Sequence, residues 1–312
     1  MRYVEVEGLT VSRIGLGTWQ FGSREWGYGE TYATEVAPAL VRRAIELGIT
    51  MIDTAEVYGP GRSERIVGET LAGVPAADRA DVVVATKFLP IAPTERILAW
   101  QAAGSRRRLR MDAIDLYYAH WPNPFVSAQR VMQSLGPLVD AGLVRRVGVS
   151  NYSVAGWEEA ELALGLPVIA NQVRFSLVSS SPARALVPYA AAEGRLVVAY
   201  SPLGQGILAG PRAGVSPRGF RAAQRLVRGG GAGASIAGIA GVVADVARAH
   251  DATPAQVALA WVIAHPNTIA IPGARTIEQL EENAAAADLV LGDDEVARLS
   301  AAAGAAGSAA SA

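Results

Sequence analysis

The sequence predicts an α/β fold, a (β/α)8 TIM barrel with an N-terminal β-hairpin. Short β-like runs recur along the chain, and each is followed by a stretch with helical periodicity, an order that favours a parallel sheet with crossover helices. Eight such runs occur within the 312 residues, which suggests closure into a barrel, and such barrels form one domain of about 250 residues or more. We therefore expect residues 1–312 to form a single domain.

The eight expected strands are Arg13–Gly17, Thr50–Asp53, Val82–Thr86, Ile114–Ala119, Arg146–Val149, Val168–Asn171, Leu196–Tyr200 and Thr268–Ile271. The expected helices are Glu35–Leu47, Ser63–Leu71, Thr94–Leu109, Ala128–Ala141, Val154–Leu164, Pro182–Ala192 and Pro254–His265, with another beginning at Thr276.

Two further segments have a distinct character. Polar and apolar residues alternate on both sides of Glu7-Gly8, which predicts a small hairpin that caps the bottom of the barrel. Residues 203–238 are rich in Gly, Arg, Pro and Ser, and a loop of this length is usually functional, for example as a lid.

The alternative fold is an open doubly wound sheet, whose first strand usually feeds a Gly-x-Gly-x-x-Gly turn that holds a pyrophosphate. Gly15 and Gly17 are followed by Thr-Trp-Gln-Phe-Gly, and the later Gly204-Gln205-Gly206 also lacks a third glycine at the required offset. The barrel is therefore the favoured interpretation.

Composition excludes several classes of protein. Hydrophobic residues make up 51% of the chain and charged residues 18%, which suits a large core. A net charge of −1 provides no field that would hold nucleic acid or an anionic membrane. The absence of cysteine excludes disulfides and thiolate sites. No signal peptide or membrane span is recognisable, so we expect a cytoplasmic protein.

Polar side chains end three consecutive expected strands. Asp53 ends the second, Lys87 follows the third, and His120 follows the fourth, while Tyr58 lies five residues after Asp53. In a (β/α)8 barrel these strand ends meet at the face that carries the active site. The four side chains are therefore expected to share one site.

This set of residues suits a tyrosine acid. A phenol has a reference pKa near 10, and a neighbouring cation would lower that pKa toward neutrality. Lys87 would stabilise the phenolate, Asp53 would keep Lys87 charged, and His120 would hydrogen-bond the carbonyl oxygen that Tyr58 protonates. The proposed chemistry needs no metal and no covalent intermediate.

From Gly15 to Asn283 the chain resembles the aldo-keto reductase family. Asp53-Thr54-Ala55-Glu56-Val57-Tyr58-Gly59, followed by Ser63-Glu64 and Gly68, is similar to its first signature, and Lys87 and His120 match the other two tetrad positions. The resemblance implies an NAD(P)H-dependent oxidoreductase with the catalytic residues Asp53, Tyr58, Lys87 and His120. Histidine at the fourth position implies reduction of an aldehyde or ketone rather than of a carbon–carbon double bond.

The resemblance also implies a nucleotide site. Ser150, Asn151 and Gln172 would hold the nicotinamide carboxamide, Tyr200 would stack on the ring, and Arg275 would pair with a 2′-phosphate, which favours NADPH (NADP+) with NADH possible. The full set of expected cofactor contacts is Gly17, Thr18, Trp19, Asp53, Ser150, Asn151, Gln172, Tyr200, Ser201, Pro202, Leu203, Gly204, Gly206, Gly273, Ala274, Arg275, Thr276, Gln279, Glu282 and Asn283.

The substrate side is defined less sharply. We expect Trp19, Tyr58, Phe88, His120 and Trp121 to contact a small carbonyl compound, and Trp26, Tyr28 and residues 203–238 are further candidates for pocket walls. The oligomeric state is left open.

Three alternative functions compete with carbonyl reduction. A non-catalytic NADPH-binding sensor, like the potassium-channel β subunits that share the fold, would bind the nucleotide with little turnover. A glycosidase would need two carboxylates such as Asp53 and Glu56, which leaves Lys87 unexplained. A metal-dependent hydrolase is weaker still, because the three histidines lack ligand spacing.

Overall fold

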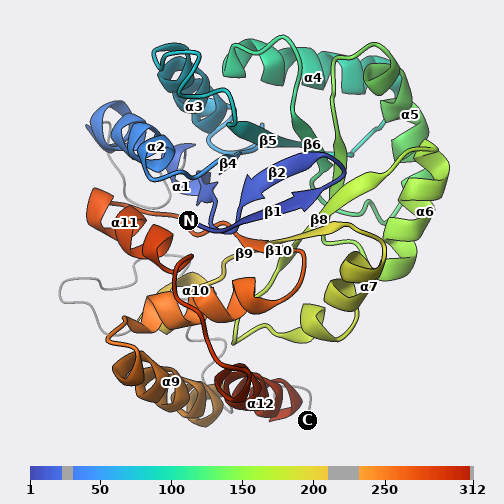
Figure 1. Cartoon of the computed structure of the whole chain (residues 1–312). Helices are drawn as coiled ribbons and strands as arrows, with labels where there is room; N and C mark the ends of the chain where they lie inside the picture. The colour runs from blue at the N-terminus through green and yellow to red at the C-terminus, as the bar shows by residue number, and fades with distance from the viewer. Residues whose placement is uncertain (23–30, 210–231, 310–312) are drawn as a thin grey trace.

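The computed structural model describes residues 1–22, 31–209 and 232–309. Eight parallel strands lie in the order β10-β9-β8-β7-β6-β5-β4-β3, so spatial neighbours are also consecutive in the chain (Figure 1). The strands are β3 (Leu16–Gly17), β4 (Met51–Asp53), β5 (Val83–Phe88), β6 (Leu116–Ala119), β7 (Val147–Ser150), β8 (Val168–Arg174), β9 (Leu196–Tyr200) and β10 (Thr268–Ala270).

The first and last strands of the sheet meet. Ile14 forms a parallel bridge with Ala270, the amide of Gly15 donates to the carbonyl of Ala270 at 2.8 Å, and Gly17 donates to Pro272 at 3.1 Å. These bonds close the sheet into a barrel. The predicted (β/α)8 fold is confirmed.

Helices surround the barrel (Figure 1). Five of the described helices begin after a Ser or Thr whose hydroxyl accepts a backbone N–H of the first turn, namely Thr94, Ser127, Ser153, Thr253 and Thr276. The helical segments are α1 (Trp19–Gly22), η2 (Tyr32–Val36), α2 (Ala37–Glu46), α3 (Arg62–Ala72), α4 (Glu95–Leu109), α5 (Ala128–Asp140), α6 (Val154–Leu164), η3 (Ser181–Arg184), α7 (Leu186–Ala192), η4 (Gly204–Ala209), α9 (Ala232–Ala249), α10 (Pro254–Ala264), α11 (Ile277–Ala285) and α12 (Asp293–Ala309). Within the described ranges, none of these helices could cross a membrane.

The predicted hairpin is confirmed, and Figure 1 shows it lying across the ring of strands. Its strands, β1 (Tyr3–Val6) and β2 (Leu9–Ser12), pair antiparallel. Glu7 and Gly8 make the two-residue turn at φ of 50° and 67°, the left-handed region that such a turn requires. Its apolar side chains are buried in one cluster with the barrel interior, so the hairpin plugs the barrel.

Alternation along each strand separates the barrel interior from the layer beneath the helices. In β5, Val83 and Ala85 belong to the interior cluster, whereas Val84 and Phe88 pack in the outer clusters. The same alternation turns Lys87 toward the barrel axis. A buried charge needs polar partners, and the partners of Lys87 lie at the carboxyl ends of the strands.

The region after β9 differs from the expected loop. Helix η4 begins at Gly204 and α9 begins at Ala232. Residues 210–231, which hold all five arginines of the 203–238 segment, lie outside the described residues. The sequence analysis missed α9 and α12, which pack against each other beside α10. Both helices are rich in Ala and Gly, and α9 begins inside the Gly-rich segment that was expected to be a loop.

Candidate active site

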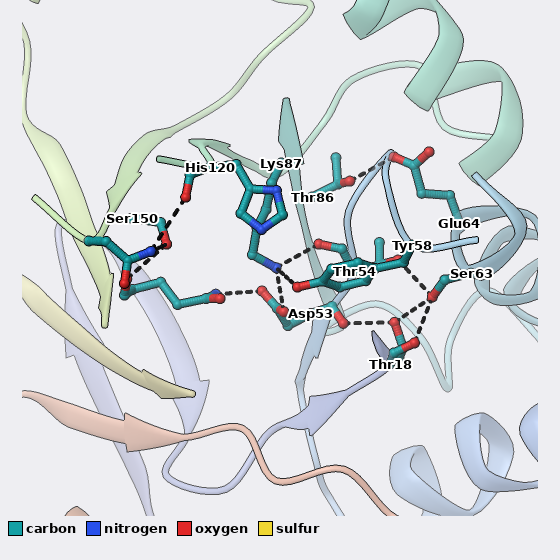
Figure 2. A network of polar contacts seen from close by, with 12 residues as sticks. Thr18, Asp53, Thr54, Tyr58, Ser63, Glu64, Thr86, Lys87, His120 and Ser150 are labelled. Carbon is teal, nitrogen blue, oxygen red and sulfur yellow. Dashed lines mark hydrogen bonds and ion pairs between the residues drawn. The ribbon is translucent and has the colours of Figure 1, made fainter. Parts of the chain in front are cut away.

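The four tetrad residues come together at the carboxyl ends of adjacent strands (Figure 2). Asp53 is the last residue of β4, Lys87 lies near the end of β5, and His120 follows β6. Tyr58 reaches the same place from the loop between β4 and α3. The predicted clustering of Asp53, Tyr58, Lys87 and His120 agrees with this geometry.

Lys87 is the centre of the cluster and is fully buried. Its ammonium donates to Asp53 Oδ1 at 2.5 Å, to the carbonyl oxygen of Thr54 at 2.8 Å and to the hydroxyl oxygen of Tyr58 at 3.3 Å. An ammonium has three protons and no acceptor, so the Tyr58 oxygen accepts from Lys87. The proton of Tyr58 must therefore point elsewhere.

Asp53 is held on both of its carboxylate oxygens. Oδ1 accepts from Lys87, and Oδ2 accepts from Gln172 Nε2 at 2.6 Å. Burial raises the pKa of the Asp53 carboxyl, and Lys87 and Gln172 oppose that rise. Burial likewise lowers the pKa of Lys87, and the Asp53 charge opposes that fall. Each charge is therefore sustained by the other.

The pKa of Tyr58 differs from the expectation. Burial raises this pKa well above its usual range, and the Asp53 charge adds to the rise. Lys87 does not bring this pKa to neutrality, because burial has the larger effect and the Asp53 carboxylate lies 2.5 Å from the ammonium. Tyr58 is thus a fully protonated phenol at neutral pH.

His120 faces Tyr58 with 5.9 Å between ring centroids and stacks on Trp121 at 6.0 Å. Burial, together with the Lys87 charge, lowers the pKa of His120 to about 3, so the ring is neutral near pH 7. Its Nδ1 is buried without a hydrogen-bond partner in the described part of the chain. A buried Nδ1 without a partner costs less as a bare acceptor than as an N–H group, because the Lys87 cation lies nearby. This favours the tautomer of His120 that carries its proton on Nε2.

The loop that carries Tyr58 has a close backbone contact. Gly59 has a φ of 57°, and a Cβ at this position would lie 2.0 Å from the carbonyl oxygen of Gly22. The amide of Glu56 also donates to the carbonyl of Lys87 at 3.2 Å. Glycine at position 59 therefore lets the loop pass against α1 and keeps Tyr58 over Lys87.

The side chains expected at the nicotinamide lie beside this cluster. Ser150 Oγ donates to the carbonyl of Gln172 at 2.9 Å, and Asn151 Nδ2 donates to Ser150 Oγ at 2.9 Å. Tyr200 donates its phenol proton to Asn151 Oδ1 at 3.0 Å. Because Gln172 uses its amide nitrogen on Asp53, its carbonyl oxygen is the group left for a carboxamide N–H.

The loop after β3 brings three expected contacts to the same rim. A Cβ at Gly17 would lie 2.7 Å from the carbonyl oxygen of Ile271, so only glycine allows this approach. Thr18 is buried and binds the carbonyl of Asp53. Trp19 is 42% exposed, and its ring lies 6.4 Å from that of Tyr58, a position open to a ligand.

The loop after β9 has an unusual backbone. Four of its residues have positive φ, which bends the chain tightly among the expected cofactor contacts: Ser201, Gly204, Gln205 and Gly206. A Cβ at Gly206 would meet no atom of the described residues within 4 Å. Pro202 and Leu203 lie in the same turn, which amides of Gly204 and Gly206 close.

The residues expected around the 2′-phosphate lie where β10 leads into α11. Thr276 caps α11 by accepting the amide of Gln279 at 3.3 Å, and Gln279 accepts the amide of Arg275 at 3.0 Å. The half-buried Arg275 guanidinium makes no hydrogen bond or ion pair with the described residues. An unpaired cation at a helix N-terminus fits a phosphate group. The other residues expected here are Gly273, Ala274, Glu282 and Asn283, of which Asn283 is buried and Glu282 half-buried.

Two residues at this rim were missed. Gln20 Nε2 and the Tyr32 hydroxyl both donate to the carbonyl of Ala274, each at 3.0 Å. They tie α1 and η2 to the segment before Arg275. The only signal in the sequence was the position of Gln20 directly after Trp19.

The structure contradicts the expectation for Phe88. Its ring is fully buried, packs 4.8 Å from Tyr117 and belongs to the cluster beneath α4 and α5. Adjacent strand residues face opposite sides, so Phe88 points outward because Lys87 points inward. Trp121, in contrast, is 48% exposed. Trp26 and Tyr28 lie outside the described residues.

This barrel, with its lysine, carboxylate, phenol and imidazole at the carboxyl ends of the strands, belongs to the aldo/keto reductase family, whose model matches residues 13–303. The protein is an oxidoreductase, and the family prediction is confirmed.

Individual relatives agree with this assignment. The chain is 49% identical to an uncharacterized oxidoreductase of Mycobacterium tuberculosis, with 93% of this chain and 89% of the relative covered. It is 35% identical to the methylglyoxal reductase YeaE of Escherichia coli, with coverage of 93% and 90%. The crystal structure of an aldo/keto reductase from Klebsiella pneumoniae in complex with NADP and acetate superimposes with a TM-score of 0.75 at 32% identity, covering 95% of this chain and 93% of that one.

Proposed function

We propose that this protein reduces aldehydes or ketones to alcohols with NADPH. The observation that carries the proposal is the buried Lys87 ammonium, which binds the Asp53 carboxylate and the Tyr58 phenol at once beside a neutral His120. A phenol, a paired cation and a neutral imidazole on one rim form a proton donor with an oxygen-binding group next to it.

The nucleotide is proposed from the chemistry of the donor set. Ser150, Asn151 and Gln172 are neutral hydrogen-bonding groups suited to a carboxamide. Among the described residues, Arg275 has no side-chain partner at the start of α11. A 2′-phosphate would form an ion pair with the Arg275 guanidinium, which favours NADPH over NADH. NADP in the Klebsiella structure supports the same cofactor.

The proposed proton transfer follows from the hydrogen bonds. NADPH, when bound, supplies a hydride to the carbonyl carbon. Tyr58, whose oxygen already accepts from Lys87, directs its proton toward the carbonyl oxygen, and His120 donates from Nε2 to that same oxygen. The C=O group gains one hydride and one proton and becomes CH–OH. Lys87 then stabilises the Tyr58 phenolate until it is reprotonated.

The test measures NADPH binding by fluorescence and NADPH consumption with a panel of aldehydes and ketones. Methylglyoxal belongs in the panel because of the Escherichia coli relative. Tyr58→Phe should abolish turnover, by about a thousandfold or more, and leave NADPH binding within about twofold. Full activity of Tyr58→Phe on a verified substrate would contradict the mechanism, and tight binding of NADPH without any turnover would favour the sensor function.

The nucleotide preference has its own variant. Arg275→Ala should weaken NADPH binding by about tenfold or more, the size of one charge-assisted phosphate contact, and should leave NADH binding unchanged. Equal loss for both nucleotides would place Arg275 away from the 2′-phosphate.

The single-domain organisation and the cytoplasmic location stay predictions.

A further inference from the structure

Three buried hydroxyl groups meet behind the tetrad, outside the roles assigned so far. Ser63 Oγ lies 2.7 Å from Thr18 Oγ1 and 2.9 Å from Thr54 Oγ1, and it donates to the carbonyl of Thr18 at 3.0 Å. All three side chains are fully buried. They come from the segment after β3, the loop after β4 and the first turn of α3, and Figure 2 shows them side by side.

The direction of these hydrogen bonds is constrained, because each hydroxyl has one proton. Thr18 Oγ1 donates to the carbonyl of Asp53 at 2.8 Å, and Thr54 Oγ1 donates to Ser63 Oγ. The proton of Ser63 is then left for Thr18. Ser63 Oγ shares its single proton between Thr18 Oγ1 and the Thr18 carbonyl oxygen, so the chain runs from Thr54 through Ser63 to Thr18, whose own hydroxyl proton goes to the carbonyl oxygen of Asp53.

This chain of hydroxyls ends on the groups that hold Lys87. Asp53 contributes its carboxylate and Thr54 its carbonyl oxygen to the ammonium, at 2.5 and 2.8 Å. The backbone amide of Ser63 also donates to the carbonyl of Tyr58 at 3.2 Å. One residue of α3 thus contacts both ends of the loop from Thr54 to Tyr58.

We propose that Ser63 is a positioning residue, which through Thr54 and the Tyr58 loop sets the distance between the Lys87 ammonium and the Tyr58 phenol. The catalytic part of this inference rests on the proposed function, whereas the placement of Lys87 does not. Without the Ser63 hydroxyl, the Thr54 hydroxyl loses its buried acceptor, and the Thr54 carbonyl is held less firmly toward the Lys87 ammonium. The ammonium then loses a carbonyl that favours its charged form.

The sequence provides a direct probe, because Lys87 is the only lysine in the chain. Protein labelled with 13C at the lysine ε-carbon therefore gives one lysine side-chain signal, whose titration reports the pKa of Lys87 with no substrate or nucleotide present. Removal of a hydrogen bond to the charged form lowers a lysine pKa. In Ser63→Ala we expect this titration to move to lower pH by about half a unit or more.

Kinetics form the second readout. In Ser63→Ala, kcat should fall by about tenfold or more, because a small displacement of reacting groups costs this much, with KM and NADPH affinity within about twofold. The basic limb of the kcat profile should move to lower pH with the Lys87 titration. Thr54→Val, which keeps the shape and removes the donor, should act in the same direction, and Thr54→Ser should retain more kcat than Thr54→Val.

Thr70→Val is the matched control. Thr70 is a buried hydroxyl on the same helix, and it donates to the carbonyl of Ile66 at 2.7 Å within the helix. Its loss should leave kcat and the Lys87 titration unchanged. Because Ser63 and Thr54 act in one chain, Ser63→Ala combined with Thr54→Val should lose no more than about twofold beyond the larger single loss.

The outcomes separate the two proposals. A Lys87 titration that does not move in Ser63→Ala or Thr54→Val overturns the positioning role, whatever the activity. An equal shift in Thr70→Val also overturns it, because the effect would then be general loosening of α3. No turnover by the wild-type protein, with the Lys87 shift present, would contradict the proposed function and leave Ser63 as the residue that positions Lys87.

Discussion

Burial shifts the pKa values of Tyr58 and Lys87 in opposite directions. Burial holds Tyr58 protonated and lowers the pKa of Lys87. The charged lysine can be kept only because Asp53 lies 2.5 Å away. Replacing either Lys87 or Asp53 alone would therefore leave the other as a buried charge without its partner.

The pH dependence of both reaction directions follows from these shifts. Carbonyl reduction needs protonated Tyr58, so its rate should stay level through neutral pH and fall only at basic pH, where Lys87 loses its proton. Alcohol oxidation needs the phenolate, so it should increase with pH. Because the pKa of His120 is about 3, His120 should produce no acid limb above pH of about 5. We would measure kcat in both directions from pH 5 to 10, and an acid limb near pH 6.5 that His120→Gln removed would contradict a neutral His120.

A second buried charge stands behind β5. Glu64 is fully buried and accepts from Thr86 at 2.6 Å and from Arg108 Nε at 2.6 Å. Arg108→Ala would leave this carboxylate without its cation and should lower the free energy of unfolding by about 3 kcal/mol, measured by urea denaturation. The exposed pair of Arg110 with Glu69, 3.4 Å apart, provides the control, since Arg110→Ala should cost at most about 1 kcal/mol. Equal costs would show that Glu64 finds another partner.

At the scale of elements, the hairpin and the catalytic rim lie at opposite ends of the strands. Leu9 in β2 is 6% exposed and belongs to the interior cluster. Leu9→Ala should reduce stability by about 2–5 kcal/mol, the usual cost of a core cavity, with kcat within about twofold of wild type at a temperature where the protein is folded. Loss of kcat in the folded variant would instead indicate that the plug shapes the active site.

The two helices that the sequence analysis missed are joined by a titratable pair. His250, just after α9, lies 2.8 Å from Glu295 of α12. The amide of Gly292 and the His250 ring lower the pKa of Glu295. A carboxylate with a depressed folded pKa contributes stability above its unfolded pKa of about 4.3, and this contribution is lost as the pH falls through the folded value. Thermal unfolding from pH 7 to 3 should therefore show a smaller loss for Glu295→Gln than for wild type. Asp294→Asn, at an exposed neighbour, should behave as wild type.

At the scale of the whole molecule, the closed barrel makes distant segments depend on one another. Residues 13–17 pair with both β4 and the segment around β10, so the ring cannot open at one place without losing bonds at the other. We expect the chain to unfold as one cooperative unit. Unfolding followed by circular dichroism should coincide with that followed by fluorescence of the buried Trp157 and Trp261. Two separate transitions would contradict the single domain.

NADPH at 100 times its Kd should raise the free energy of unfolding by about 2.7 kcal/mol.

Much of this architecture could be predicted from local signals. The eight strands, the hairpin turn at Glu7-Gly8 and the caps at Thr94 and Thr253 depend on residues that are close in the sequence. The outward direction of Phe88 also follows from its alternation with Lys87 along β5. Helices α9 and α12 were not predicted, because glycines interrupt both sequences and glycine is a poor helix former.

By itself, the sequence determined the order of strands and helices and the presence of an acid, a cation and an imidazole after consecutive strands, because these depend on local periodicity and on which end of a parallel strand bears the loops. Only the tertiary structure decided the charge state of Tyr58 and the identity of the groups around Lys87. A pKa depends on burial and on charges a few ångströms away, and the Thr18, Thr54 and Ser63 hydroxyls meet only when β3 pairs with β4 and α3 packs beside them.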